Sequence, residues 1–520
     1  MLTGKKRKKI LRMAVLSTAT LLLCSPWSFD AYAADESAPM NRPGAKNDAG
    51  VVNVTSPDAY PDLMPCIPKL RDPLNYRGSK RKILRQIEPG KDGWLFRTAD
   101  FRTDFSMPDK TFNDMLALNN ELKKKGVDLY VIIQPSRAML MHKYILPGYE
   151  PEGYDPEVAR QNFKGLIKRL NDAGIHTVDL SDIPDDLIYF FKGDPHWRRE
   201  GAKWSAKQVA KMVEQNPKFK DIPTEKFASE ITWWLESEKG EFDEFVEDIC
   251  DVTRPPERRP MWATTSLSGV SANSLFGEVK YPEIAIIGTS NTAHEEDFNF
   301  VGSLKEAMNV DIRNRAVSAG GFSGAGILFF SSNEFHEHPP KILLWEFLAH
   351  HDFNDYVGFR QMLPAIEGPC SDKDALAISD DLVLNVPKEE RKPNMPAMLP
   401  LKKGVFGPPS PINPKARVPK KMYEKVFIDH LEDKHIRARD SYLQIDVTDP
   451  EDRELRISTL YANGDADTID VTRSRRAKNP GRYYIDFNPD IDQELMLMQI
   501  ETDKPVGKIK ARICPIKRNL

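Results

Sequence analysis

The sequence predicts an α/β domain built on a mainly parallel sheet, followed by an all-β sandwich. Two observations predict this order. Up to residue 369, short apolar runs alternate with amphipathic segments, which is typical of strands alternating with helices. Beyond a Pro-rich stretch that begins at Cys370, short segments of alternating hydrophobicity are separated by turn residues, the pattern of a sandwich. A chain of 520 residues has room for two to three domains.

In the first part, period-3.6 and continuous apolar patterns predict the individual elements. We expect helices at 112–125, 163–170, 199–215, 304–308 and 324–330, and strands at 127–133, 175–180, 284–287, 312–317 and 341–347. The segment 216–280 is irregular, and we interpret it as an elaborated connection. In sheets of this kind the active groups collect at the carboxyl ends of the strands.

In the second part, turn signals such as Asn463-Gly464 and Asn479-Pro480-Gly481 separate β-rich segments. We expect strands at 443–447, 455–461, 469–472, 483–487, 495–501 and 506–514. The Pro-rich stretch from Cys370 to about Pro419 is predicted to be a linker or a long crossing loop. The second domain, linker included, is therefore placed at 370–520.

The N-terminus has the three parts of a secretory signal peptide at residues 1–33. A cluster of Lys and Arg is followed by a short apolar run and then by Ala31-Tyr32-Ala33, an A-x-A cleavage site. The alternative is an uncleaved membrane anchor. Residues 34–65 are small, polar and Pro-rich, and we expect an N-terminal arm there. No later apolar run has the length of a membrane helix, so we expect an exported mature chain without a transmembrane segment.

Removal of residues 1–33 would lower the formal charge from −3 to about −8, because this segment carries six cationic residues and Asp30. Four cysteines would remain, at positions 66, 250, 370 and 514. An even number in an oxidising compartment favours two disulfides, and three connectivities are possible. We favour Cys66–Cys250 and Cys370–Cys514, because each bridge then stays within one predicted domain.

Two short motifs indicate acyl-transfer chemistry. In Gly193-Asp194-Pro195-His196-Trp197, a carboxylate two residues before an imidazole can hold Nδ1–H and leave Nε2 free as a general base. The apolar run at 284–287 ends in Gly288-Thr289-Ser290, which exposes a serine after a buried strand. Together they predict an Asp194–His196–Ser290 triad. The alternative interpretation of each motif alone is an ordinary turn.

Further site residues follow from the loops after neighbouring strands. The turn at Gly320-Gly321 is a candidate for backbone donors to an oxyanion, although glycines there also suit a plain turn. His350 and His351 follow the strand at 341–347 and are candidates for an acceptor groove, with ordinary loop histidines as the alternative.

We expect neither a metal nor a cofactor. The clusters 336–338 (His-Glu-His) and 350–352 (His-His-Asp) lack the spacing of structural zinc sites.

The second domain is basic whereas the rest of the chain is acidic. Residues 401–520 carry a formal charge of about +4, which favours a module that holds a polyanion. The candidate polysaccharide-binding residues are Arg473, Arg475, Arg476, Lys508 and Lys510. The alternative for each is an ordinary solvated side chain. Export and the acidic chain as a whole disfavour nucleic acid as a partner.

Several blocks together resemble a known family. They are G-K-D-G-W-L-F at 90–96, G-D-x-H-W-x-x-x-G-A at 193–202, I-G-T-S at 287–290, L-L-W-E-F at 343–347 and the C-terminal sandwich. The chain resembles the periplasmic alginate O-acetyltransferases of the two-domain AlgX type, and the four cysteines fit this family. The AlgJ type shares the catalytic blocks but lacks the sandwich.

The resemblance implies an SGNH-hydrolase-like acetyltransferase domain at 66–369, with Ser290 as nucleophile, His196 as base and Asp194 orienting it. Two positions depart from the expected pattern: Pro195 replaces a small polar residue and Asn291 an aromatic one.

The resemblance also implies a periplasmic enzyme that acetylates mannuronate hydroxyls of alginate through an acetyl-serine, beside proteins of the alginate export complex. The acetyl donor and the position acetylated stay open. The alternatives are a secreted esterase with the same triad and a polysaccharide-binding scaffold without catalysis.

Overall fold

The computed structural model describes most of the predicted catalytic domain and of the sandwich. The described residues are 60–77, 84, 86–235, 239–268, 281–379, 384–385, 424–428, 431–448, 454–474, 476–502 and 509–518. The predicted signal peptide, most of the predicted arm and much of the Pro-rich stretch lie outside them, as do Arg475 and Lys508. Within the described part of the chain, no helix is both long and apolar enough to cross a bilayer.

The first domain is built on a five-stranded sheet, and every described strand pair in it is parallel. In spatial order its strands are β4 (His176–Thr177), β3 (Asp128–Gln134), β9 (Ile342–Leu348), β7 (Ile284–Ile287) and β8 (Ile312–Asn314). Residues 284–287 are wholly buried, as a continuous apolar strand covered on both faces must be. The predicted parallel sheet is confirmed, although β4 and β8 are shorter than expected.

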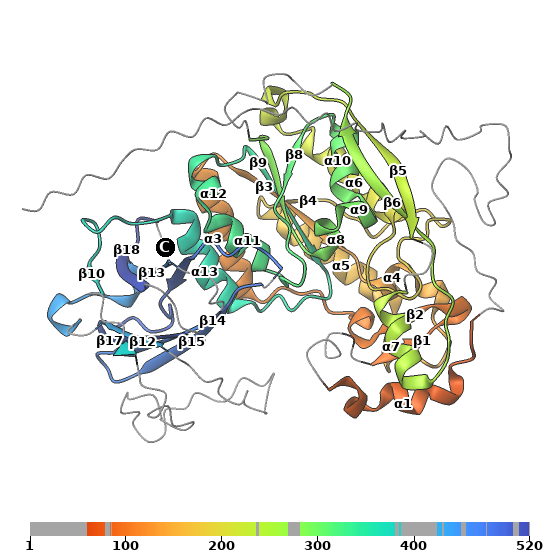
Figure 1. Cartoon of the computed structure of the whole chain (residues 1–520), viewed down its shortest axis with the longest axis horizontal. Helices are drawn as coiled ribbons and strands as arrows, with labels where there is room; N and C mark the ends of the chain where they lie inside the picture. The colour runs from red at the N-terminus through yellow and green to blue at the C-terminus, as the bar shows by residue number, and fades with distance from the viewer. Residues whose placement is uncertain are drawn as a thin grey trace, which may run out of the picture. The chain divides into compact units, whose positions relative to one another are not determined.

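Helices cover both faces of this sheet. The long ones are α3 (Asp109–Lys124), α5 (Pro156–Asp172), α6 (Arg199–Val213), α10 (Phe300–Met308) and α13 (Tyr356–Glu367), and the short α11 spans Gly324–Phe330. Helix α13 contacts both α3 and α11, and α6 contacts α10; Figure 1 shows these two groups on opposite sides of the strands. Each predicted helix is present, and α3 ends before Gly126, whose positive φ suits a C-terminal cap.

The segment 216–280 contains more structure than the sequence analysis predicted. Strands β5 (Phe227–Leu235) and β6 (Arg259–Ser266) form an antiparallel pair, and the acidic run folds as α7 (Glu241–Cys250). Helix α7 is amphipathic: Phe242, Phe245 and Val246 are buried while its acidic side chains lie mostly outside. The acidic composition of this run concealed its helical apolar face from the sequence analysis. Three buried side chains on one face are sufficient to dock so short a helix.

Shorter elements complete the first domain. They are α1 (Ile67–Arg71), α4 (Arg137–Leu140), α8 (Ser290–Ala293), α9 (Glu295–Phe298) and α12 (Asn333–Glu337), and the antiparallel pair β1 (Ile87–Pro89) with β2 (Leu95–Arg97). Helices α1 and α7 contact each other in a small core of their own, separate from the main core around the sheet.

The second domain consists of two antiparallel sheets around their own apolar core. One has the order β10 (Ala377–Ile378), β18 (Ile509–Pro515), β13 (Ser441–Val447) and β16 (Arg482–Asp486). The other has the order β11 (Leu384–Asn385), β12 (Glu424–Ile428), β17 (Leu495–Thr502), β14 (Glu454–Tyr461) and β15 (Ala466–Thr472). The sandwich is confirmed, but β10 and β11 lie within the predicted linker. Such two-residue strands carry no periodicity that a sequence pattern could reveal.

Both favoured disulfides are present. Cys66–Cys250 joins the residue before α1 to the last residue of α7, with a Cα–Cα distance of 5.6 Å. Cys370–Cys514 joins the segment after α13 to β18, with a Cα–Cα distance of 6.0 Å. The second bridge therefore ties the sandwich to the end of the catalytic domain.

Helix α13 packs against β16 of the sandwich. At this contact the Arg360 guanidinium lies 2.8 Å from the Asp467 carboxylate, and Arg518 lies 3.0 Å from Glu367. All four side chains are at most about one-sixth exposed. Buried, hydrogen-bonded ion pairs of this kind fix the geometry of a contact even where they add little net stability.

Candidate active site

The nucleophile turn follows a buried strand. β7 ends at Ile287, and α8 begins at Ser290 with Thr289 as its N-cap. The Thr289 hydroxyl accepts a hydrogen bond from the Asn291 amide at 3.3 Å, as N-cap residues do. Ser290 is partly exposed at the carboxyl edge of the sheet, where groups acting on a substrate are expected.

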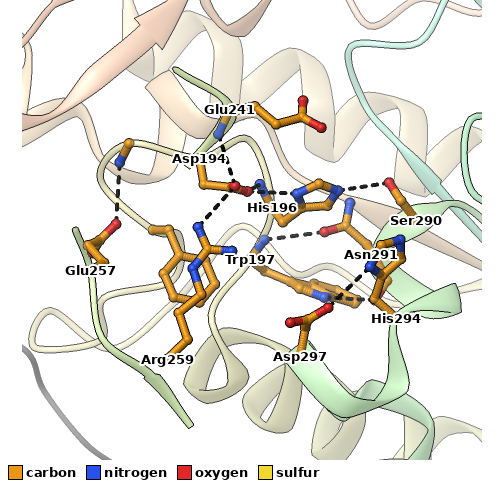
Figure 2. A network of polar contacts seen from close by, with 12 residues as sticks. Asp194, His196, Trp197, Glu241, Glu257, Arg259, Ser290, Asn291, His294 and Asp297 are labelled. Atoms are coloured by element: carbon orange, nitrogen blue, oxygen red, sulfur yellow. Dashed lines mark hydrogen bonds and ion pairs between the residues drawn. The ribbon is translucent and has the colours of Figure 1, made fainter. Parts of the chain in front are cut away.

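His196 and Asp194 lie in the loop that precedes α6. His196 Nδ1 lies 2.7 Å from Asp194 Oδ1, and its Nε2 lies 2.9 Å from Ser290 Oγ (Figure 2). Because an ionised carboxylate only accepts, Nδ1 carries the proton and Nε2 accepts from the serine hydroxyl. The three predicted residues thus form one continuous hydrogen-bonded line.

Pro195 is compatible with this turn. Asp194 Oδ1 also accepts from the His196 backbone amide at 3.0 Å, which closes an Asx turn around the intervening residue. The turn uses no N–H of residue 195, so a proline there removes no hydrogen bond.

Asp194 is held by a second set of donors. Its Oδ2 accepts from the Arg259 guanidinium at 3.1 Å and from the Glu241 amide, the first residue of α7, at 3.3 Å. Burial opposes ionisation of Asp194, which is 4% exposed. The nearby charges of His196 and Arg259 and the hydrogen bonds outweigh that burial and hold the pKa of Asp194 well below its usual range. Asp194 is therefore a carboxylate at neutral pH.

Arg137, at the start of α4, stabilises the loop that carries Asp194 and His196. Its buried guanidinium donates to the Leu95 carbonyl at 2.8 Å and to the Asp194 carbonyl at 2.9 Å. It also contacts the carbonyls of Phe191 and Lys192. Burial lowers the pKa of Arg137 to about 10, so it stays charged at neutral pH. One arginine therefore holds four carbonyls, that of Leu95 and three in the stretch just before His196.

Asn291 connects the two motifs. Its side-chain oxygen accepts from the Trp197 amide at 3.2 Å, and its carbonyl accepts from the Trp197 indole at 3.1 Å. Its Nδ2 donates to Gln134 at the end of β3 at 3.1 Å. The two side-chain bonds of Asn291 are ones that an aromatic ring could not make, and they connect the loop before α6 to the turn after β7 and the end of β3.

Glu346 contacts the turn that carries Ser290. This residue of β9 is wholly buried, and its carboxylate accepts from the Thr289 amide at 2.8 Å and from the hydroxyls of Thr289 and Thr292. A Cβ on Gly288 would lie 2.7 Å from Glu346 Oε2, so the close approach requires glycine there. Burial raises the pKa of Glu346 against the opposing effect of these donors.

The predicted oxyanion turn lies next to the nucleophile turn. The backbone of Val317 donates to the Gly288 carbonyl at 3.0 Å, so the loop after β8 runs beside the end of β7. Ala319 and Gly321 have positive φ, an uncommon conformation for alanine. Gly320 lines a cavity of about 200 Å³ together with residues of this loop and of the sandwich. The role of Gly320 and Gly321 as oxyanion donors stays a prediction.

His350 and His351 contact arginines rather than the triad. His350 Nε2 lies 3.2 Å from the Arg97 guanidinium, and the His351 carbonyl accepts from Arg102 at 2.7 Å. A guanidinium only donates, so His350 accepts and is neutral. Burial and Arg97 lower the pKa of His351 to about 4, and the same two causes hold the pKa of His350 well below its usual value. Two neutral imidazoles packed on an arginine have the surroundings of structural histidines.

The candidate polymer-binding residues differ in their exposure and in their partners. Arg473 is 2% exposed, donates to Gln361 of α13 at 2.6 Å and stacks on the Tyr483 ring. Lys510 pairs with Asp372, whereas Arg476 is exposed. Arg473 thus lies against the catalytic domain, and Arg476 is exposed to solvent. No group of three or more potential metal ligands occurs among the described residues.

Sequence reasoning missed Arg259, Arg137 and Glu346. Arg259 and Arg137 lie 65 and 57 residues from Asp194, and no local pattern connects them to it. Glu346 did leave a signal, because it is the one charged residue in the apolar run Ile342–Leu348. A charge within a buried strand requires partners and so marks a functional or structural site.

Comparisons with known proteins agree with this architecture. The model of the SGNH hydrolase-like domain of the acetyltransferase AlgX matches residues 87–349, and that of a C-terminal carbohydrate-binding module matches residues 411–520. The alginate biosynthesis protein AlgX of Pseudomonas aeruginosa is 32% identical over 434 residues, which are 82% of this chain and 83% of that protein.

Two further matches support the same family. The probable alginate O-acetylase AlgJ of Pseudomonas aeruginosa is 28% identical over 274 residues, 50% of this chain and 68% of that protein. The solved structure of Pseudomonas aeruginosa AlgX aligns with a TM-score of 0.71 at 29% identity, over 86% of this chain and 98% of that one. With an SGNH hydrolase-like acetyltransferase domain followed by a carbohydrate-binding module, the chain belongs to the AlgX family.

Proposed function

We propose that this enzyme transfers acetyl groups to mannuronate hydroxyls of alginate in the periplasm, through an acetyl-Ser290 intermediate. The observation that carries the proposal is the hydrogen-bonded line Asp194–His196–Ser290. Its family supports the substrate, because the AlgX relatives are alginate biosynthesis proteins and the AlgJ relative is a probable alginate O-acetylase.

In the first half-reaction His196 Nε2 takes the Ser290 proton while Oγ attacks the carbonyl carbon of an acetyl donor. Asp194 stabilises the imidazolium that forms, and Arg259 keeps Asp194 in the geometry that this requires. The donor's leaving group departs with the proton from His196, which leaves acetyl-Ser290. The identity of that donor is open.

The negative charge of the tetrahedral intermediate needs donors that are in place beforehand. We assign this role to the Ser290 amide and, in the Gly320-Gly321 turn, to the Gly321 amide, because the Gly320 amide donates to the Val317 carbonyl at 3.2 Å. Loss of one such donor typically costs about 10²–10³ in rate. The contact between Val317 and Gly288 supports the assignment, because it holds the turn beside the nucleophile.

In the second half-reaction a mannuronate hydroxyl replaces water as the acceptor. His196 removes its proton as the oxygen attacks acetyl-Ser290, and that proton returns to Ser290 Oγ when the ester bond breaks. A transferase must therefore favour sugar over bulk water. The carbohydrate-binding module supports this preference, since a polymer held on the same chain has a high effective concentration at the serine.

The same proposal places the enzyme in the alginate export complex. The predicted signal peptide and the two disulfides support the periplasm, an oxidising compartment. Of the basic candidates in the module, Arg476 is the one that the structure leaves exposed, and Arg475 and Lys508 lie outside the described residues.

Acetyl transfer from a chromogenic acetyl ester to purified mannuronate oligomers tests the proposal. Mass spectrometry of the oligomers should show added acetyl groups with the native enzyme and none with Ser290→Ala. The same variant should release less chromophore by at least about 10⁴-fold.

Two results would contradict the proposal. Acetate release with unmodified oligomers would indicate a secreted esterase. Oligomer binding without either reaction would indicate a polysaccharide-binding scaffold.

A further inference from the structure

A second serine–histidine–aspartate cluster lies beside the triad. His294 Nε2 is 2.8 Å from Ser318 Oγ, and its Nδ1 is 3.2 Å from Asp297 Oδ2. Figure 2 shows the contact between His294 and Asp297. The cluster follows the order of the triad: an acid holds Nδ1–H, and Nε2 accepts from a serine hydroxyl.

The chain places this cluster at the catalytic edge of the sheet. His294 directly follows α8, the short helix that begins at Ser290, and Ser318 lies in the loop after β8, the strand paired with β7. The His294 and His196 rings lie 6.0 Å apart, centroid to centroid, and both pack against Phe298. Two imidazoles with the same hydrogen-bonding pattern therefore pack against the same phenylalanine ring.

Access distinguishes this cluster from the polar groups that brace the site. The His294 side chain is 36% exposed and that of Asp297 23%, whereas Glu346 is wholly buried. Within the described residues, the Ser318 hydroxyl has no hydrogen bond other than the one to His294. Because its hydrogen is committed to His294, its oxygen keeps lone pairs that can accept from a ligand.

An acceptor sugar requires more than a base. A pyranose hydroxyl that attacks acetyl-Ser290 must be aimed, and its ring carries a vicinal hydroxyl within a few ångströms. An oxygen acceptor next to the triad would accept a hydrogen bond from the vicinal hydroxyl of the sugar. A site built to form a hydrogen bond with a substrate hydroxyl discriminates strongly against molecules that lack this hydroxyl. Water has no second hydroxyl of this kind.

We propose that His294, oriented by Asp297, holds the Ser318 hydroxyl as an acceptor for the hydroxyl adjacent to the attacking one. The inference rests on the function proposed above and names a specificity-determining subsite for its second half-reaction. In that step the attacking oxygen bonds the acetyl carbon, the bond from that carbon to Ser290 Oγ breaks, and the proton passes through His196 to Ser290. Ser318 keeps its own proton throughout.

The variant Ser318→Ala tests the subsite with little change to the fold, because the loop's contact with the sandwich uses the Ser318 carbonyl, which accepts from Ser474. A chromogenic acetyl ester reports acetylation of Ser290, and the ratio of acetylated oligomer to free acetate reports how the intermediate partitions. We expect acetylation within about twofold of the native rate and a partition ratio about tenfold lower. His294→Ala should change the ratio in the same direction.

His435→Ala is the matched control. His435 also pairs with an acid, Glu494, at 3.1 Å, but it lies exposed on the sandwich. It should leave both readouts unchanged.

Four results would overturn the inference. Equal losses in acetylation and partition for Ser318→Ala would indicate a structural role only. An unchanged partition ratio would exclude the subsite while leaving the proposed function intact. An acetyl group found on Ser318 in the quenched enzyme would make it a second nucleophile. If the native enzyme acetylates no oligomer, the proposed function fails and the subsite fails with it.

Discussion

Two buried carboxylates, Asp194 and Glu346, lie near Ser290, the proposed nucleophile, and their surroundings shift their pKa values in opposite directions. Asp194 faces positive charge from Arg259 and from His196 when it is protonated, and its pKa is well below the usual range. Glu346 faces only neutral donors of the nucleophile turn at hydrogen-bond distance, and burial raises its pKa. The charge of the partners, more than burial, decides which carboxylate is held ionised.

The opposite pKa shifts of Asp194 and Glu346 correspond to two different roles. In the proposed mechanism Asp194 must stay an anion, because its charge stabilises the imidazolium that forms in each half-reaction. Glu346 needs acceptor oxygens in the right places, because it positions Thr289 and Thr292 and, through them, Ser290. Four variants and conditions test this division, from the largest expected effect to the smallest.

Asp194→Asn removes the anion and should have the largest effect. The amide changes the favoured tautomer of His196 and leaves Arg259 without its carboxylate. We expect kcat for the chromogenic ester to fall by about 10⁴-fold. A fall of less than tenfold would mean that Asp194 does not serve as the acid of the triad.

Arg259→Met removes the charge that holds Asp194. Breaking a buried ion pair on one side typically costs about 3–5 kcal/mol, and we expect this loss in urea unfolding. Activity should fall by about 10- to 100-fold. The neighbouring Arg258→Met is the control, because Arg258 lies over the Trp234 ring rather than at Asp194. Equal losses for both variants would refute the assignment.

Glu346→Gln keeps the shape and one acceptor oxygen but replaces the other with a donor. We expect kcat to fall by about tenfold with little change in KM, since the variant disturbs the nucleophile and not the binding of substrate. Glu334→Gln on α12, which removes a carboxylate paired with Arg313 and Arg315, is the control. A fall in kcat as large as that of Asp194→Asn would contradict the different roles assigned to the two carboxylates.

The pH dependence of stability should distinguish the same pair. The pKa of Asp194 is lowered, so its contribution is present above the unfolded value of about 4 and is lost as the pH falls below it. The pKa of Glu346 is raised, so its contribution is present at low pH and is lost as the pH rises through the folded pKa.

Urea unfolding of the native protein, Asp194→Asn and Glu346→Gln between pH 3 and 7 measures this contrast. The deficit of Asp194→Asn should shrink below about pH 4, whereas that of Glu346→Gln should shrink as the pH rises. Deficits that do not vary with pH would contradict both assignments.

The sequence predicted what is local in the chain. The hydrogen-bonded line of Asp194, His196 and Ser290 could be predicted because the first two share one turn and Ser290 follows one buried run, so each motif fits within a few residues. The parallel sheet followed from continuous apolar strands. The pairing of β5 with β6 could not be found, because Trp233 is exposed and the pattern of β5 does not separate a buried face from an exposed one.

The supporting residues depend on contacts that only the fold creates. Arg259 comes from β6, Glu241 from α7 and Arg137 from α4, and each contacts Asp194 across more than 45 residues of sequence. His294 illustrates the same limit: its bond to Ser318 joins the loops after two neighbouring strands.

The disulfide between Cys370 and Cys514 makes the sandwich a closed covalent loop that starts and ends beside the catalytic domain. A single backbone cut anywhere between these cysteines leaves both fragments attached to each other. A nicked enzyme would therefore keep its mass on a gel without reductant and would separate into two bands when reduced. Proteolytic damage in the Pro-rich stretch would not by itself release the carbohydrate-binding module from its catalytic partner.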